Sequence, residues 1–319
     1  MFKNRRTTKN RTKNRTNIKK RKIINCGDIL VNVSRNGIIE SIHSGHLLIL
    51  DKKGKTLFSL GKNDFLMYPR SAVKAIQASA MVRKGLDIKD ELLALVCSSH
   101  MGTNLHQQKV KEILATVGLD ERALQNTPLL AMSKETGIPT SLAAPCSGKH
   151  AGMITTAKIN NLDITNYKNP NHPVQIACRA ELELLSREKI TKIAVDGCGA
   201  PLFAITLKGL ATAIHNLMIS TDPVHQRVVH ACKSYPIMVS GENTLPTLAM
   251  QSVPALFVKS GAEGVLVAGL PSGETIAWKV SDGSSRGEFE LLIASLKKIG
   301  INNTLFNSYA TDENIQAAF

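Results

Sequence analysis

The sequence has few aromatic residues, no long hydrophobic run and no acidic residue near its N-terminus. Aromatic residues make up 4% of the 319 residues, and Trp278 is the one tryptophan. This scarcity argues against a surface on which nucleic-acid bases stack. No run approaches the roughly 18 apolar residues of a membrane helix, and the N-terminal region lacks the apolar segment of a secretory signal. We therefore expect a cytoplasmic protein with no membrane partner.

The positive charge is concentrated at the N-terminus. The net charge is +15, and residues 1–22 contain 11 Lys or Arg and no Asp or Glu. The remaining chain therefore carries about +4, an ordinary value for its size. Because residues 1–22 have almost no apolar content, we predict a disordered, solvated tail there and a single folded domain over residues 23–319. An RNA-contacting arm or a transit-like peptide is the alternative, but nucleic acid is not the expected partner.

The cysteines form no CxxC pair and are scattered through the chain. In a chain expected to be cytoplasmic, this pattern argues against disulfides. The six residues are Cys26, Cys97, Cys146, Cys178, Cys198 and Cys232.

Strand-like segments stand at both ends of the chain, and helical segments occupy the middle. Alternating residues and Gly-containing turns predict hairpins over residues 29–42 and 47–60. Apolar spacing predicts helices over residues 71–84, 87–97, 104–117, 146–158 and 173–187, with Asn104 as a cap. Further strands are expected over residues 192–195, 255–258, 264–270 and 274–280, and a helix over 287–296. This order predicts an α/β fold of the α+β type, with one antiparallel sheet flanked by helices and a helical lobe.

A Ser-x-x-Lys motif at Ser71 and Lys74 suits an activated nucleophile. Three residues apart on a helix, the two side chains share one face. The serine hydroxyl can then attack a carbonyl while a neutral lysine takes its proton. The same spacing occurs elsewhere in the chain, where an exposed polar pair is the simpler interpretation.

The context of Ser71 strengthens the interpretation. The motif follows the hairpins, and a Lys259-Ser260-Gly261 string stands at the end of a later strand-like segment. An early Ser-x-x-Lys on a helix with a late Lys-Ser/Thr-Gly on a strand is the layout of β-lactamases and penicillin-binding proteins. Their Ser-x-Asn motif is not found between the two, so Ser99 is the candidate for the second serine. A polar residue at a helix end is the alternative for Ser99.

Two strings place small residues beside thiols. Cys146-Ser147-Gly148-Lys149-His150 and Asp196-Gly197-Cys198 stand at turns, where small residues let a ligand approach the backbone. Two thiolates with a Lys or a His could hold a soft divalent metal such as zinc. Buried, inert thiols are the alternative.

Together these segments resemble the thermolabile, type II L-asparaginase family, whose members have a β-lactamase-like serine hydrolase fold. The matching pieces occur in family order and extend from about residue 30 into the C-terminal region. They are the hairpin region 31–61 and the strings YPRSAVKAIQA, LALVCSSHMG, PCSGKHAGM, NPNHPVQ, DGCGAPLFAI, KSGAEG and WKVSDGSSRG.

The resemblance implies a role for each matching residue. Ser71 would be the nucleophile and Lys74 its general base, and Ser99 with Lys259 would form a second Ser–Lys pair. Asp196 would receive the α-ammonium of the substrate. The other implied residues are Arg70 and His150, which would line the pocket, and Cys146, Lys149 and Cys198, which would bind a zinc ion that shapes the pocket.

The reaction implied is hydrolysis of L-asparagine to L-aspartate and ammonia through an acyl-enzyme, by a protein that is commonly a homodimer in this family. A glutaminase or another Ser–Lys amidase is the alternative among enzymes. Two non-enzymatic alternatives are an inactive scaffold with a nucleic-acid-binding tail and a zinc-dependent structural protein.

Overall fold

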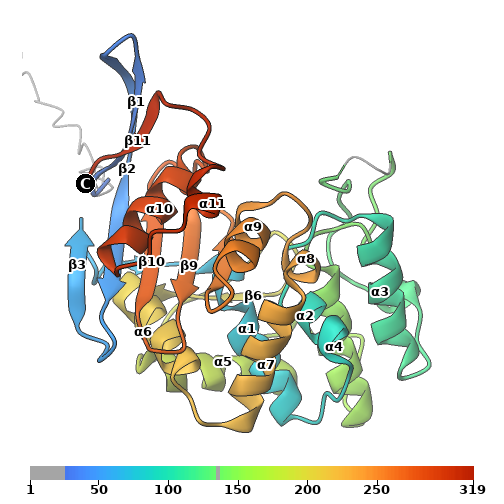
Figure 1. Ribbon diagram of the computed structural model, residues 1–319. Helices are drawn as coiled ribbons and strands as arrows, with labels where there is room; N and C mark the ends of the chain where they lie inside the picture. The colour runs from blue at the N-terminus through green and yellow to red at the C-terminus, as the bar shows by residue number, and fades with distance from the viewer. Residues whose placement is uncertain (1–25, 134–136) are drawn as a thin grey trace, which may run out of the picture.

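The computed structural model describes residues 26–133 and 137–319 (Figure 1). The basic tail predicted over residues 1–22 lies outside these ranges. Within the described ranges, no helix has both the length and the apolar character required to cross a bilayer.

The main sheet is antiparallel and joins the two ends of the chain (Figure 1). Its order is β11-β1-β2-β10-β9-β8, and β3 pairs with β2. The strands are β1 (Asp28–Arg35), β2 (Ile38–Leu50), β3 (Thr56–Leu60), β8 (Phe257–Gly261), β9 (Val265–Gly269), β10 (Thr275–Val280) and β11 (Ile315–Ala317). Two small sheets pair β4 (Leu66–Met67) with β7 (Ile205–Thr206) and β5 (Ile193–Val195) with β6 (Pro201–Phe203). The predicted antiparallel sheet from both ends is confirmed.

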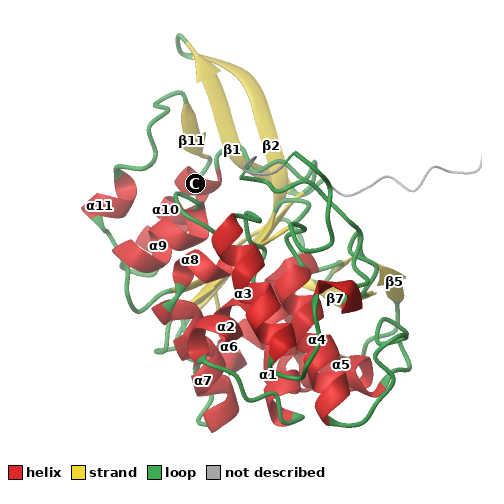
Figure 2. Cartoon of the chain, turned by 90° about the vertical axis from the view of Figure 1, so that its right-hand side faces the viewer, coloured by secondary structure: helices red, strands yellow, loops and turns green. Residues whose placement is uncertain are grey.

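Strand β2 is continuous where the sequence suggested two separate strands. Its second half pairs with β10 and β3 and is buried, whereas its first half pairs with β1 in a hairpin that projects from the body (Figure 2). Gly45 lies in the middle, and a Cβ there would come within 2.3 Å of the Lys279 carbonyl oxygen. The glycine therefore permits a close strand contact and does not end the strand.

Helices form the lobe beside the sheet and cover parts of it (Figure 2). They are α1 (Lys74–Arg83), α2 (Asp90–Val96), α3 (Asn104–Ala115), α4 (Ser147–Ile159), α5 (Pro173–Ser186), α6 (Leu207–Met218), α7 (Pro223–Ser234), α8 (Pro236–Val239), α9 (Leu245–Ser252), α10 (Glu288–Lys298) and α11 (Thr304–Asn307). Two short 3₁₀ helices are η1 (Arg70–Val73) and η2 (Glu121–Ala123). The segment 207–252, left unassigned from the sequence, contains α6 to α9.

The cap of α3 differs from the prediction by one residue. Thr103 is the N-cap, and its hydroxyl accepts a hydrogen bond from the backbone N–H of His106. Asn104 is the first helical residue. A threonine and an asparagine are both favoured caps, so composition alone does not separate adjacent candidates.

The sheet and the helical lobe meet at the start of α1. Helix α6 packs on β2, β9 and β10, while α1 packs against α4, α5 and α7. Strand β8 lies against η1, which leads directly into α1. The residues at the junction of sheet and lobe therefore come from η1, α1 and β8.

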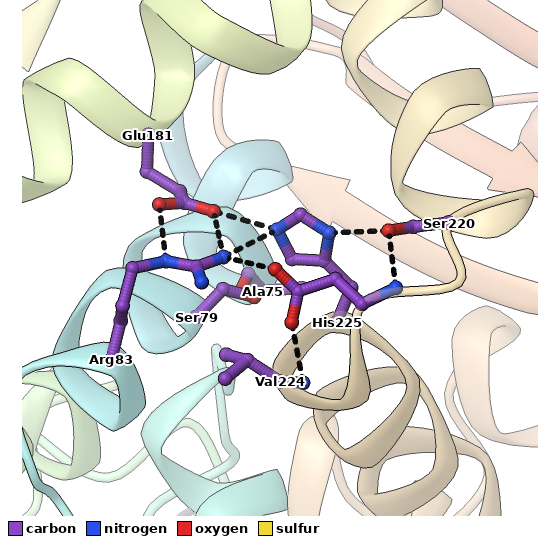
Figure 3. Close-up of polar contacts among 8 residues, drawn as sticks. Ala75, Ser79, Arg83, Glu181, Ser220, Val224 and His225 are labelled. Carbon is purple, nitrogen blue, oxygen red and sulfur yellow. Dashed lines mark hydrogen bonds and ion pairs between the residues drawn. The ribbon is translucent and has the colours of Figure 1, made fainter.

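A polar network fastens the far end of α1 to its neighbours (Figure 3); Glu181 and His225 are buried in it, and Arg83 is exposed. Arg83 donates two hydrogen bonds to Glu181 on α5, at 3.1 and 3.2 Å, and one to Asp222 at 2.7 Å. The His225 ring on α7 lies 2.6 Å from the Glu181 carboxylate and 2.7 Å from the Ser220 hydroxyl. The network links three helices through opposite charges and hydrogen bonds.

Candidate active site

A cavity of about 530 Å³ lies where the sheet meets the helical lobe. Its walls come from η1, β8, the loop before α4, the turn after β5 and the start of α10. Of the residues predicted from the sequence, those that line it are Arg70, Ser71, Ser99, Cys146, Asp196 and Cys198. Lys74, Lys149, Lys259 and His150 are buried, at 3% exposure or less.

Ser71 is held at the cavity by tight backbone packing. The residue before it, Arg70, has a φ of 52°, in the left-handed region that non-glycine residues seldom adopt. On the opposite side, a Cβ on Gly261 would come within 2.9 Å of the Pro69 carbonyl oxygen and 3.2 Å of the Ser71 backbone nitrogen. A glycine at the end of β8 thus allows the strand to approach the serine closely.

Two buried amines converge on the second serine. Lys74 Nζ lies 3.3 Å from Ser99 Oγ, and Lys259 Nζ lies 3.1 Å from the same oxygen. Lys74 Nζ also contacts the Ser98 carbonyl oxygen and lies 3.2 Å from Cys146 Sγ. Ser71 and Lys74, although both described, share no direct hydrogen bond in this state. The structure therefore places Ser99 between the two amines, and Ser71 and Ser99 line the same cavity.

The two amines influence each other electrostatically. Burial, and then the charge of Lys74, lower the pKa of Lys259 to about 7. Lys259 also donates a 2.7 Å hydrogen bond to the Ser260 carbonyl oxygen. A substantial fraction of Lys259 is therefore neutral near pH 7, which is the form that accepts a proton.

Arg70 and Asp196 form a polar pair on the cavity wall. Arg70 donates a hydrogen bond from Nε to Asp196 Oδ1 at 3.0 Å, and its Nη2 forms an ion pair with the same oxygen at 2.9 Å. The backbone N–H of Gly197 donates to the same oxygen at 2.9 Å. Burial acts to raise the pKa of Asp196, but Lys149 and Arg70 outweigh it and hold the pKa below its usual value.

The three predicted metal ligands lie together at the cavity floor. A hydrogen bond from Cys198 lowers the pKa of Cys146 well below its usual value and raises the pKa of Cys198. Lys149 Nζ lies 3.3 Å from Cys198 Sγ. Burial opposes the charge of Lys149, but the Cys198 and Cys146 sulfurs outweigh it and raise the pKa of the amine.

This donor set fits zinc if the amine is neutral. Two sulfur donors and one nitrogen donor suit a soft divalent ion and leave a coordination position open. In residues 26–133 and 137–319, no group of three or more His, Cys, Asp or Glu could hold a metal. The lysine is therefore the donor that completes a three-ligand set, and zinc would have to displace its proton.

His150 lies behind the cavity. It is fully buried, and its Nδ1 lies 2.6 Å from the Tyr167 hydroxyl. Its Nε2 is buried and has no partner among the described residues. Burial lowers the pKa of His150 well below its usual value, so the ring is neutral.

Several cavity residues were not identified from the sequence. Glu288 and Phe289 at the start of α10, and Ser285 just before it, line the same cavity as Ser71. Ser285 lies within the WKVSDGSSRG string but was given no role, and no motif marks Glu288 or Phe289, because an acidic first turn is common in any helix. Tyr167, the partner of His150, was also missed, since nothing in its neighbourhood signals a contact with α4.

Three solved structures have a similar backbone path at low sequence identity. A β-lactamase from Mycobacterium bovis is 12% identical, with a TM-score of 0.41 over 76% of this chain and 88% of that chain. Mglu in its native form is 13% identical, with a TM-score of 0.42 over 76% of this chain, which spans 59% of Mglu. EstCE1, a hydrolase with promiscuous acyltransferase activity, is 10% identical, with a TM-score of 0.41 over 80% of this chain and 93% of that chain.

Comparison of the sequence with protein-family models identifies the family, whereas comparison with individual curated proteins does not. No curated protein shows significant similarity to the chain. The family model described as L-asparaginase II matches residues 31–316, which include every predicted site residue. The chain therefore belongs to the L-asparaginase II family.

Proposed function

We propose that this asparaginase-type amidohydrolase converts L-asparagine to L-aspartate and ammonia through an acyl-enzyme on Ser71. Membership of the L-asparaginase II family supports the reaction class and the substrate. The observation that carries the mechanism is the placement of Ser71 on the cavity beside a Ser99 hydroxyl held between two buried amines.

The reaction would proceed in two halves. Ser71 Oγ attacks the side-chain amide carbon of asparagine while its proton passes to the neutral amine of Lys74, directly or through Ser99. The tetrahedral intermediate then collapses: the C–N bond breaks, and the nitrogen leaves as ammonia after receiving that proton. Water, deprotonated by the same amine, attacks the ester carbon and releases aspartate and the Ser71 hydroxyl.

The second Ser–Lys pair, Ser99 and Lys259, would assist proton transfer at the first, Ser71 and Lys74. A neutral Lys259 can accept the Ser99 proton while Ser99 takes one from a protonated Lys74, so Ser99 can relay a proton between the two amines. This relay depends on the burial of both amines, which removes them from water.

Ammonia release from L-asparagine and L-glutamine, with ring opening of a β-lactam followed separately by its ultraviolet absorbance, tests the proposal. Turnover of asparagine that Ser71→Ala abolishes is the expected result. A preference for glutamine would change the substrate and leave the chemistry intact. Absence of turnover with all three amides, in the presence of zinc, would reject the proposed function.

We also propose that Cys146, Lys149 and Cys198 hold a zinc ion. When bound, the metal would fix the floor of the cavity and keep the Lys149 amine neutral. Its test is the metal content of the purified protein, with about one zinc per chain expected and a loss of that zinc in Cys198→Ala. Binding should weaken as the pH falls, because protons compete for thiolate and amine. Zinc retained in Cys198→Ala would reject this donor set.

A further inference from the structure

A second carboxyl group stands on the wall of the candidate active site. Glu288 is the first residue of α10 and lines the same cavity as Ser71 and Asp196. It comes from the C-terminal segment, whereas Ser71 and Asp196 come from η1 and the turn after β5. The cavity therefore contains two carboxyl groups on different elements.

The two carboxyl groups have different surroundings. Asp196 Oδ1 accepts one hydrogen bond from Arg70 Nε and one from the backbone N–H of Gly197, and it forms an ion pair with Arg70 Nη2, while the Cys198 thiol lies 3.8 Å from Oδ2. Among the described residues, the Glu288 side chain forms no hydrogen bond and no ion pair. Glu288 therefore has all of its acceptor positions open to a ligand, whereas Asp196 is already engaged in holding Arg70.

The environment of Glu288 favours an incoming cation. Burial, and then the neighbouring Glu290, raise the pKa of Glu288 to about 7. The ionised carboxylate is thus poorly stabilised without a partner, and a cationic group beside it would stabilise it. A buried carboxylate and an ammonium form a charge-assisted hydrogen bond, which is stronger than a neutral one.

Free asparagine presents an ammonium group, a carboxylate and a reacting amide. We propose that Glu288 is a specificity-determining residue that accepts hydrogen bonds from the α-ammonium of the substrate. Arg70, positioned by Asp196, faces the same cavity and supplies the cation for the α-carboxylate. This inference rests on the proposed asparaginase function, and it gives Asp196 a positioning role in place of direct ammonium binding.

Binding to an unreactive enzyme separates these roles. In the Ser71→Ala protein, the affinities of L-asparagine and of succinamate are measured by calorimetry. Succinamate retains the carboxylate and the amide but lacks the ammonium group. Adding Glu288→Gln should weaken asparagine binding roughly tenfold to a hundredfold, the range for a lost hydrogen bond to a charged group. It should leave succinamate binding unchanged within about twofold.

Glu290→Gln is the matched control, because Glu290 lies two residues along the same helix and is not part of this cavity. It should weaken neither ligand, because removing the Glu290 charge favours the ionised form of Glu288. Equal weakening of both ligands by Glu288→Gln, or unchanged asparagine binding, would overturn the inference. Selective loss of asparagine binding in Asp196→Asn but not in Glu288→Gln would also overturn it.

Turnover by the wild-type protein keeps the two proposals distinct. If asparagine is hydrolysed but Glu288→Gln binds it normally, the inference fails and the proposed function stands. If asparagine is bound with selectivity from Glu288 but never hydrolysed, the proposed function fails and the inference stands. If asparagine does not bind at all, both are rejected.

Discussion

The two ends of helix α1 carry basic residues in opposite kinds of environment. At its N-terminal end, Lys74 lies with Lys149 and Lys259 in a buried cluster whose contacts are hydroxyl, carbonyl and sulfur groups. In the described part of the chain, none of these three amines forms an ion pair. At the other end, Arg83 is matched by Glu181 and Asp222 (Figure 3).

This difference in partners indicates a catalytic role for the Lys74 end of α1 and a stabilising role for the Arg83 end. Buried charges without counter-charges are costly to the folded state, whereas a buried charge with partners is tolerated. Groups with perturbed pKa values that line a cleft are more often functional than structural. The Lys74 end therefore contains, in Lys259, an amine that can lose its proton near neutrality, and the Arg83 end fastens the same helix in place.

The largest expected effect is the loss of activity in Lys74→Met. Removing the proposed general base should lower kcat/KM for asparagine by about 10³-fold, or about 4 kcal/mol. The unfolding free energy should not fall, because a buried amine is replaced by an apolar side chain of similar length. Steady-state kinetics and urea unfolding give the two readouts. Activity within tenfold of wild type would show that another group is the base.

At the opposite end, Glu181→Gln should destabilise the fold by roughly 1.5–3 kcal/mol, because hydrogen bonds between charged groups are lost. The substitution removes the carboxylate that both Arg83 and His225 contact, although Asp222 still pairs with Arg83. Well below the unfolding transition, kcat should remain close to wild type. Glu121→Gln is the control, since its ion pair with Lys111 is exposed and its loss should not measurably change stability. Equal stability of Glu181→Gln and Glu121→Gln would show that the Arg83 network stabilises the fold no more than an exposed ion pair does.

Lys259→Arg should lower kcat/KM by about 10²-fold, because a guanidinium does not deprotonate near neutrality. In the wild type, the neutral amine is the proton acceptor, so kcat/KM should rise with pH through about 7 and then level off. The Lys259→Arg variant should not show this rise of kcat/KM with pH. Unfolding free energy of the wild type should also rise between about pH 7 and 10.5, since the unfolded state binds the additional proton there. A flat activity profile across neutrality would contradict the role of Lys259.

Gly261→Ala should have the smallest effect, a loss of roughly tenfold in activity. The added Cβ meets the backbone of Pro69 and Ser71, which cannot move aside as a flexible side chain would. The nucleophile would therefore shift relative to Ser99. Gly137→Ala, where a Cβ meets nothing within 4 Å, is the control. Unchanged kinetics in both variants would mean that close packing at Ser71 is not required.

Local patterns in the sequence were enough to predict the sheet and the earlier helices. The alternation around Arg35-Asn36-Gly37 predicts the β1–β2 hairpin, and Pro173 marks the first turn of α5. Helix α7 was missed although Asp222 before Pro223 has the same form of start signal. The continuity of β2 through Gly45 depends on a contact with Lys279, which no local pattern reveals.

The candidate site could also be predicted only in part from the sequence. Ser71 and Lys74 could be found because their spacing on one helix carries the chemistry. The resemblance to a family supplied the pairing of Ser99 with Lys259, which lie 160 residues apart. The Arg70–Asp196 pair and the position of Glu288 arise from the packing of η1, the turn after β5 and α10. Such contacts between distant segments are tertiary and leave no periodic trace in the sequence.

The most direct test of the central claim is to find the acyl group. Wild-type protein is mixed with L-asparagine, quenched in acid during turnover and digested, and the peptides are examined by mass spectrometry. The account predicts a β-aspartyl ester on Ser71, absent from Ser71→Ala together with ammonia release. An ester on Ser99, or ammonia release that persists in Ser71→Ala, would contradict it.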